Sequence, residues 1–217
     1  MPTIFSPKID KIFWQVVVSL GLAGALWIGV AYYYFTPEYT RVGYAPEQPV
    51  PFSHKLHAGQ LGMDCRYCHT NVEKSPHANV PATQTCMNCH LHIKKNSPLL
   101  APVRESWKTG KSIRWKRIHK LPDYAYFNHA VHVNRGVSCV SCHGKINEMK
   151  VVYHAKPLSM GWCLDCHRNP EQYIRPVDQV TNLDWEPPEG QTQIEIGTQL
   201  KTKWKICPPD NCQGCHH

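Results

Sequence analysis

The longest apolar stretch of the chain covers residues 12–35 and is interrupted by only two polar residues. It is long enough for a helix that crosses a bilayer, which needs about 20 residues. Trp14 at one end and a run of tyrosines at the other are typical of the boundary between lipid and water. Lys8 and Lys11 precede the stretch, and positive charge tends to stay in the cytoplasm. We therefore predict a cytoplasmic N-terminus over residues 1–11, a single-pass transmembrane anchor helix over 12–35, and a periplasmic, extracytoplasmic remainder.

The alternative for this stretch is a cleaved signal peptide. The apolar core of a signal spans about 7–15 residues, which is shorter than the stretch found here. A small-residue cleavage site is also missing, since the exit runs through tyrosines, Phe35 and Pro37. We expect an anchor that stays in the lipid bilayer of the cell membrane.

The rest of the chain is rich in cysteine, histidine and proline. It holds five copies of the motif Cys-x-x-Cys-His, which is the attachment signature of c-type haem. The paired cysteines are Cys65 and Cys68, Cys86 and Cys89, Cys139 and Cys142, Cys163 and Cys166, and Cys212 and Cys215. The histidines that complete the motifs, and that we predict as proximal iron ligands, are His69, His90, His143, His167 and His216.

The motif spacing has a chemical reason. Two cysteines on a short curled segment reach the two vinyl groups at one edge of a porphyrin, and the next residue places an imidazole under the iron. Zinc is the alternative, but zinc needs four ligands that converge on one point, and five motifs do not pair into such sets. We predict five covalently bound haem c groups in a pentahaem c-type cytochrome.

Four of the motifs form two copies of one unit. Phe52-Ser-His-Lys-Leu-His57 precedes the first two motifs, and Phe127-Asn-His-Ala-Val-His132 precedes the next two, 75 residues later. The predicted organisation is a proline-rich linker, a first dihaem module, a connecting segment, a second dihaem module, and a C-terminal arm that carries the fifth haem. The respective ranges are 36–51, 52–103, 104–126, 127–170 and 171–217.

Iron that only carries electrons keeps both axial positions filled, commonly by His or Met. The candidates on the distal side come first from the two repeated histidine pairs, because a spacing of three residues presents two imidazoles from one helical turn. These are His54, His57, His129 and His132, followed by His119 before the second module. His77 and His154 occupy equivalent places in the repeat, each nine residues before a cysteine, but polar, proline-flanked loops make surface positions the alternative. His92 and His217 are expected to be solvated neighbours of motif histidines.

Few residues are available to enclose these groups. Roughly 165 residues follow the linker, about 33 for each haem, which is too few for an ordinary layered core. We expect the porphyrin faces to form the hydrophobic core. The predicted fold is a mainly α, loop-rich multihaem cytochrome c with class III-like haem packing, little sheet, and short helices after the attachment motifs.

Composition adds little beyond the motifs. Ten of the eleven cysteines belong to motifs, and we expect Cys207 to be a buried thiol. The formal net charge is +8, and five haems would change it to about +3, too small a charge for long-range steering of partners. The basic segment 104–121 is expected to pair with haem propionates or a partner surface, not with nucleic acid.

Several runs of sequence resemble the pentahaem cytochrome c subunit of alternative complex III, a quinol:electron-acceptor oxidoreductase. They are Phe52-Ser-His-Lys-Leu-His57, Asp64-Cys-Arg-Tyr-Cys-His69, Thr85-Cys-Met-Asn-Cys-His90, Leu121-Pro-Asp123, Tyr126-Phe-Asn-His129 and Trp162-Cys-Leu-Asp-Cys-His-Arg-Asn-Pro170. The resemblance covers nearly the whole chain, including the N-terminal anchor and the isolated fifth motif.

The resemblance implies an electron-transfer subunit that is not an enzyme on its own. It implies partners within a respiratory complex: an iron–sulfur subunit, integral membrane subunits that bind quinol, and a monohaem cytochrome c. It also implies a soluble acceptor such as a monohaem cytochrome or a copper protein, and at least one haem with methionine ligation. Met149 and Met160 stand where the resemblance would place that ligand, so Met149, Met160 or His154 is expected to cap the fourth haem.

Two other function classes remain open at this point. One is a stand-alone, membrane-anchored multihaem quinol dehydrogenase that feeds a periplasmic reductase, although one helix offers little surface for a quinol site. The other is a terminal multihaem reductase with an open iron position, which the five complete Cys-x-x-Cys-His motifs do not favour.

Overall fold

The computed structural model describes residues 7–35 and 41–216, which belong to two units, Met1–Arg41 and Val42–His217. Residues 1–6 of the predicted cytoplasmic N-terminus, residues 36–40 of the predicted linker, and His217 lie outside the described residues.

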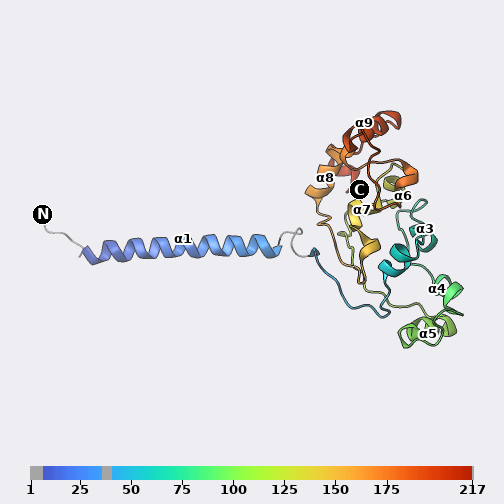
Figure 1. The fold of residues 1–217 in the computed structure, drawn as a ribbon. Coiled ribbons are helices and arrows are strands. Elements are labelled where there is room, and N and C mark those ends of the chain that lie inside the picture. Colours follow the sequence, from blue (N-terminus) through green and yellow to red (C-terminus); the bar gives the residue numbers. More distant parts are fainter. Residues whose placement is uncertain (1–6, 36–40, 217) are drawn as a thin grey trace. The chain divides into compact units, whose positions relative to one another are not determined.

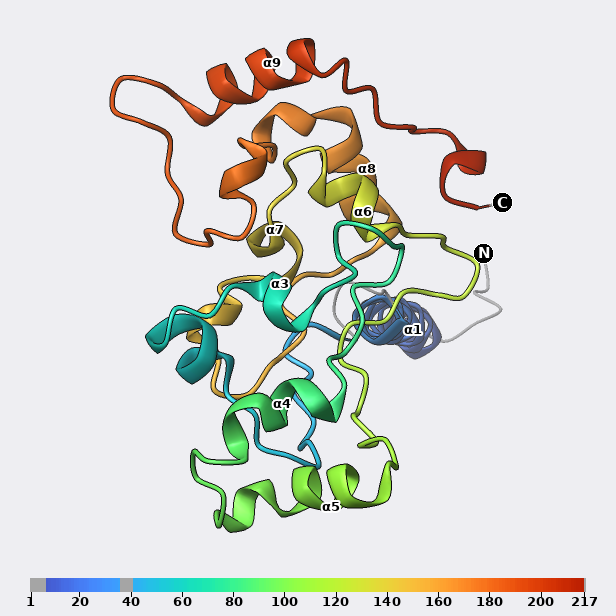
Figure 2. The ribbon, with the colours of Figure 1, turned by 90° about the vertical axis from the view of Figure 1, so that its right-hand side faces the viewer.

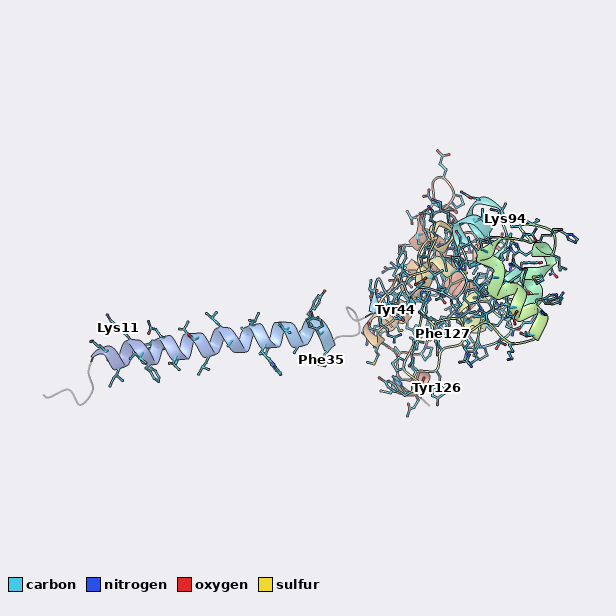
Figure 3. All side chains as sticks on the ribbon, turned by 90° about the horizontal axis from the view of Figure 1, so that it is seen from below. Lys11, Phe35, Tyr44, Lys94, Tyr126 and Phe127 are labelled. Atoms are coloured by element: carbon cyan, nitrogen blue, oxygen red, sulfur yellow. The ribbon has the colours of Figure 1, made fainter. Side chains whose placement is uncertain are left out.

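The first unit contains one long helix, α1 (Pro7–Phe35). It begins with proline, whose fixed φ suits the first helical turn. Its apolar side chains project on all sides between Lys11 and Phe35 (Figure 3). Residues 8–35 are long and apolar enough to cross a membrane, and none of the central window is buried inside the protein. The sequence prediction of a helix over 12–35 is confirmed, and a helix of this kind suits an anchor or a signal sequence.

The second unit consists of short helices joined by irregular backbone (Figures 1 and 2). Its α-helices are α3 (Cys65–Cys68), α4 (Thr83–His90), α5 (Ala101–Thr109), α6 (His129–Val133), α7 (Cys139–His143), α8 (Met160–Arg168) and α9 (Gln193–Lys203). The π-helix is η1 (Lys55–Gln60), and the 3-10 turns are η2 (Pro98–Leu100), η3 (Ile146–Glu148), η4 (Pro170–Gln172), η5 (Val177–Gln179) and η6 (Cys212–Gly214). Among the described residues β-structure is limited to one antiparallel bridge, between Val137 and Ile174. The predicted mainly α, loop-rich fold is confirmed.

The haem-attachment motifs themselves lie on helical segments, and short helices also follow some of them, as predicted: η2 and α5 come after the second motif, η3 after the third and η4 after the fourth. The first four cysteine pairs lie on α3, α4, α7 and α8, whereas in the fifth pair Cys212 lies on η6 and Cys215 follows its end. The physical reason for the helical motifs is the spacing itself, because residues three apart on a helical turn lie on the same face. Asp64 caps α3 by accepting from the backbone N–H of Arg66, and Ser159 caps α8 by accepting from that of Trp162.

Buried apolar side chains are few and scattered in the second unit. One cluster joins Val50, Met87 and Val103, with Trp115 packed against it. Val50 belongs to the predicted linker, so the described end of that segment is packed into the second unit. A domain with so few buried apolar side chains gains little hydrophobic stabilisation from its own residues.

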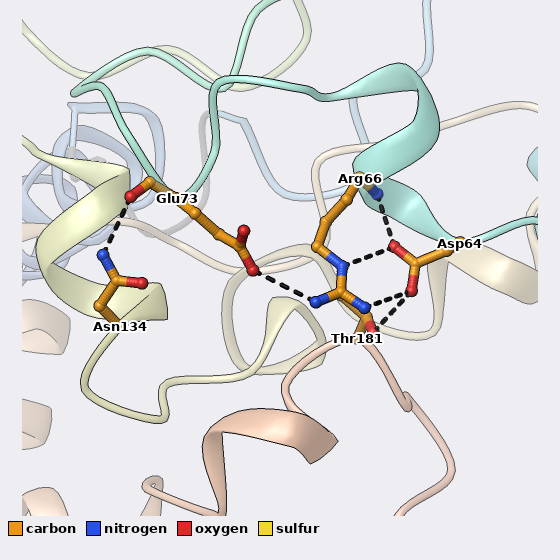
Figure 4. Close-up of polar contacts among 5 residues, drawn as sticks. All are labelled: Asp64, Arg66, Glu73, Asn134 and Thr181. Atoms are coloured by element: carbon orange, nitrogen blue, oxygen red, sulfur yellow. Dashed lines mark hydrogen bonds and ion pairs between the residues drawn. The ribbon is translucent and has the colours of Figure 1, made fainter.

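The two copies of the repeated unit are interlocked. The backbone N–H of Lys55 in η1 donates to the carbonyl of Met149 (3.0 Å), and a Cβ on Gly59 would collide with the carbonyl of Asn147. In the other direction, the side-chain amide of Asn134 donates to the carbonyl of Glu73 (2.9 Å), as Figure 4 shows. Each copy therefore completes the packing of the other.

Polar contacts also join the first copy to the C-terminal arm. Arg66 forms ion pairs with Asp64 (2.8 Å) and Glu73 (3.3 Å), and Thr181 of the arm donates to the Asp64 carboxylate (Figure 4). The hydrogen bonds from Arg66 hold the pKa of Asp64 down at about 2, so this carboxylate is charged at neutral pH. Within the arm, Glu171 accepts from Lys201 at 2.8 Å.

Candidate haem centres

The imidazoles of the attachment motifs are oriented by backbone carbonyls. Four motif histidines have Nδ1 within hydrogen-bonding distance of a carbonyl oxygen: His69 with Asn79 (2.7 Å), His90 with Ile93 (2.9 Å), His167 with Pro209 (2.6 Å) and His216 with Tyr124 (2.8 Å). A carbonyl only accepts, so Nδ1 carries the hydrogen and Nε2 keeps its lone pair. This is the arrangement of a metal-binding imidazole, whose second nitrogen donates to a carbonyl and fixes the ring.

Three candidates for the distal side share this arrangement. Nδ1 of His57 lies 2.9 Å from the carbonyl oxygen of Ser53. Nδ1 of His129 lies 2.8 Å from the carbonyl oxygen of Pro76, and Nδ1 of His132 lies 2.7 Å from that of Asn128. Burial lowers the pKa of His129 and of His132, which favours the neutral form that a metal requires.

Two of these rings face motif histidines at the separation of axial ligands. The ring centroids of His57 and His90 are 6.3 Å apart, and those of His132 and His167 are 6.1 Å apart. Two metal–imidazole bonds of about 2.0 Å each, plus the distance from each nitrogen to its ring centre, set the centroids of two axial rings about 6 Å apart. The residues therefore fit an iron held between His57 and His90, and another between His132 and His167.

The two facing pairs occupy equivalent positions in the repeat, and each rests on a phenylalanine. Phe52 stacks on His57 with centroids 4.4 Å apart, and Phe127 stacks on His132 at the same distance. Each phenylalanine also meets the other histidine of its pair edge-on, Phe52 with His54 at 4.9 Å and Phe127 with His129 at 4.7 Å. The sequence analysis did not assign a role to these phenylalanines, although their repetition was a signal. They position both imidazoles of each pair.

Three histidines gather at the third motif. The ring of His119 lies 4.4 Å from that of His143 and 5.2 Å from that of His154. Burial, followed by the charges of nearby histidines, lowers the pKa of His119 to about 4 and that of His143 to about 3. Nε2 of His119 is buried and has no protein hydrogen-bond partner, as expected for a nitrogen that binds iron. The 4.4 Å between the rings of His119 and His143 is shorter than the about 6 Å of two axial imidazoles, so the rings as placed leave no room for an iron between them, and His119 or His154 as the distal ligand of the third motif stays a prediction.

His54 lies close to the first motif. Burial lowers the pKa of His54 to about 4, and the charges of His69 and His57 add to the effect. The charge of His69 also lowers the pKa of His129, after burial. His54 and His129 are therefore both neighbours of the first motif histidine.

Burial separates the remaining candidates. His154 has an exposed fraction of 0%, so the surface position considered for it was wrong; its backbone pairs with Gly43 and Tyr44 in the segment before the first module. His77 and His92 are exposed.

The two methionine candidates also differ in burial, since Met149 is 5% exposed and Met160 is 67% exposed. The methyl group of Met149 lies 3.5 Å from the position that a Cβ on Gly144, directly after the third motif, would occupy. Methionine ligation stays a prediction, and burial favours Met149.

The expectation of a buried thiol at Cys207 was wrong. The side chain is exposed, because it lies in an irregular segment between α9 and η6.

Across residues 7–35 and 41–216, no three or more His, Cys, Asp or Glu side chains form a group that could hold one metal ion. Two pairs of imidazoles instead face each other at about 6 Å, His57 with His90 and His132 with His167.

The cysteines reveal which motifs are neighbours. The thiols of Cys65 and Cys139 hydrogen-bond each other, which lowers the pKa of Cys65 to about 7 and raises that of Cys139, so the first motif adjoins the third. The pKa of Cys68 is raised by burial and then by the charge of Cys86, so the first motif also adjoins the second. Haem attachment converts these sulfurs to thioethers, which do not titrate, but leaves their positions adjacent.

The third, fourth and fifth motifs are neighbours in the same way. Burial and then the charge of Cys166 raise the pKa of Cys142 to about 12, so the third motif adjoins the fourth. Burial and then the charge of Cys215 raise the pKa of Cys163, so the fourth adjoins the fifth. The motifs therefore follow the spatial order second, first, third, fourth, fifth. Figure 2 shows α4, α3, α7 and α8 in this order along the second unit.

Comparison with known proteins identifies the family of the chain. The family model of cytochrome c7 and related cytochrome c matches residues 50–108 and 125–217. This chain belongs to the family of cytochrome c7 and related cytochromes c. It is a multihaem cytochrome c, and membership of a cytochrome c family implies covalently bound haem c. The family also confirms the predicted fold.

A curated relative of this cytochrome is the multiheme cytochrome c subunit of a menaquinone reductase from Nitratidesulfovibrio vulgaris. The two are 39% identical over 98 residues, which cover 45% of this chain and 46% of the relative. The chain thus matches about half the length of that relative.

Proposed function

We propose that this cytochrome passes electrons from a quinol-oxidising membrane complex to a soluble acceptor on the outer side of the membrane. The observation that carries the proposal is the pair of facing imidazoles, His57 with His90 and His132 with His167, which leaves no open position on an iron between them. Filled axial positions suit electron transfer and exclude a substrate. The relationship to a subunit of a menaquinone reductase supports a quinone-linked role.

The proposal includes five covalent haems, one at each motif. His57 and His132 would be the distal ligands of the second and fourth haems, and His119 or His154 that of the third. His132 would thus take the position at the fourth haem that was expected for Met149, Met160 or His154. His54 and His129 would serve haems near the first motif, and Met149 is the favoured methionine. Covalently bound haem c supplies one-electron redox chemistry when present.

The chain's own side chains set the environment of each iron. Carbonyl oxygens hold the Nδ1 hydrogens, so that Nε2 would be free to bind iron, and the stacked rings of Phe52 and Phe127 fix the orientation of the distal imidazoles. Burial keeps His119 and His143 neutral at physiological pH, since their pKa values lie near 4 and 3. Neutral imidazole is the form that binds iron.

The proposed partners follow from the resemblance and from α1. The apolar α1 would anchor the chain in the cytoplasmic membrane with the haem-bearing unit outside. Quinol would be oxidised by integral membrane subunits, with an iron–sulfur subunit and a monohaem cytochrome c in the same complex. The soluble acceptor would be a monohaem cytochrome or a copper protein.

In a second candidate function, electrons move in the opposite direction, from the haems to a quinone. The relative is named a menaquinone reductase, which implies that electrons reach the quinone from the haem side. The two directions are distinguished in the isolated complex by whether added quinol reduces the haems or prereduced haems reduce added quinone.

We expect the isolated full-length chain in detergent micelles to be reduced by dithionite but not rapidly by a menaquinol or ubiquinol analogue. The measurement is stopped-flow absorbance of the haems at increasing quinol concentration. The same chain within its complex should be reduced rapidly, and a quinone-site inhibitor should block that reduction. Rapid, saturable, inhibitor-sensitive reduction of the isolated chain would instead establish a stand-alone quinol dehydrogenase.

A further inference from the structure

The positive charge of the chain is concentrated in one segment. Residues 91–120 contain nine Lys or Arg and one acidic residue, Glu105, for a net charge of +8. This equals the formal net charge of the whole chain, so all other residues together sum to zero. The positive and negative charges of the other residues cancel, so the excess positive charge lies in residues 91–120.

The basic side chains of this segment face solvent. We define the basic surface as Lys94, Lys95, Lys108, Lys111 and Arg114, all of which are exposed. Lys94 projects from the outside of the unit in Figure 3. No ion pair within the described part of the chain involves any of the five. Their charge is not neutralised by neighbouring acidic side chains.

The segment is fixed to the helix that carries the second attachment motif. The guanidinium of Arg104 in α5 donates to the carbonyls of Lys95 (2.9 Å) and Ser97 (2.8 Å), which ties the loop after α4 to α5. Ser106 of α5 donates to the carbonyl of Lys111 (2.6 Å) and shares a hydrogen bond with Thr83 of α4 (2.6 Å). The basic surface therefore has a defined position beside the second motif.

That position is one end of the motif order. The second motif adjoins the first, and α4 and α5 lie at the opposite end of the unit from α9 in Figures 1 and 2. Cys89 of this motif is exposed, so the attachment site reaches the surface. The two propionates of one haem would neutralise only part of the charge.

We infer that the basic surface beside the second motif is the docking site of a soluble redox protein with an acidic face. The inference rests on the proposed function, because an end of an electron-transfer chain needs an exchange partner. Complementary charge increases association rates and selects partners. Exposed apolar side chains among the basic ones, Leu91, Ile93 and Trp107, give the surface the mixed character of a transient protein interface.

The test measures binding of an acidic flavodoxin to the full-length holoprotein in nanodiscs of neutral phosphatidylcholine. The dissociation constant is followed by flavin fluorescence, and the rate of haem reduction by photoreduced flavodoxin is followed in parallel. Between roughly 0.02 M and 0.3 M salt, we expect the dissociation constant to rise and the rate of haem reduction to fall, each by about tenfold or more. Lys94→Glu with Lys95→Glu should weaken low-salt binding by about tenfold or more.

The matched control reverses two exposed charges at the other end of the unit, Lys203→Glu with Lys205→Glu, and should leave binding within about twofold. Equal losses in both variants, or equally tight binding of a basic cytochrome c, would overturn the inference. Nanodiscs of phosphatidylglycerol provide a further arm. If the difference between wild type and Lys94→Glu/Lys95→Glu disappears there, the surface binds anionic lipid and the inference fails. Haem content and reduction by dithionite test the proposed function separately.

Discussion

His132→Ala should give a chain that binds one equivalent of carbon monoxide when reduced, whereas the wild type should bind none. The ring of His132 lies 6.1 Å from that of His167, stacks on Phe127, and is oriented by the carbonyl of Asn128. Removing it would leave the iron of the fourth haem with one protein ligand and an open position. His57→Ala should have the same effect at the second haem, since the repeat places His57 equivalently opposite His90.

The measurement is a carbon monoxide titration of the dithionite-reduced proteins, with the midpoint potentials determined in parallel. Axial ligands set haem potentials over a range of about 0.8 V, so one potential should change and the others should stay. His77→Ala is the matched control, because His77 is exposed. Six-coordinate haem in His132→Ala, or carbon monoxide binding in His77→Ala, would show that the ligand assignment is wrong.

Loss of the third haem should divide the chain into two parts that no longer exchange electrons rapidly. The third motif adjoins the first through Cys139 and the fourth through Cys142, so it connects the two halves. Cys139→Ala with Cys142→Ala would remove its covalent attachment. A photoreductant linked to the exposed thiol of Cys207 would deliver electrons from the C-terminal side.

The arrival of electrons is best followed at the second haem. His57→Met would raise the potential of that haem, because methionine ligation raises the potential, and would change its absorption relative to the unsubstituted chain. With the third haem present, we expect rapid reduction of the second haem after the flash. Without it, most of the rapid phase should be lost while dithionite still reduces the second haem. An unchanged rapid phase would contradict the inferred order of the motifs.

Local sequence patterns were sufficient for the long helix and the fold class, while the ligand assignments stay predictions. The apolar stretch predicted α1, and the Cys-x-x-Cys spacing predicted a short curled segment for each pair of cysteines. The repeated Phe-x-His-x-x-His pattern predicted His57 and His132 as ligands. The pattern did not reveal which motif each imidazole faces, because that depends on how the two copies interlock through contacts such as Lys55 with Met149.

His77 and His154 show where repeat symmetry fails. They occupy equivalent positions in the sequence, yet His77 is exposed and His154 is fully buried. The difference arises from a segment outside the repeat, since the backbone of His154 pairs with Gly43 and Tyr44. Cys207 was predicted incorrectly for a similar reason, because no local pattern indicates whether an irregular segment is covered.

The proposed function depends on one haem at every motif, and the intact mass of the denatured holoprotein measures this directly. A covalent haem survives denaturation and adds a fixed mass, so the number of additions equals the number of attached haems. We expect five additions and one thiol that reacts with an alkylating reagent, that of Cys207. Fewer than five additions, together with reactive thiols at a motif, would contradict the account.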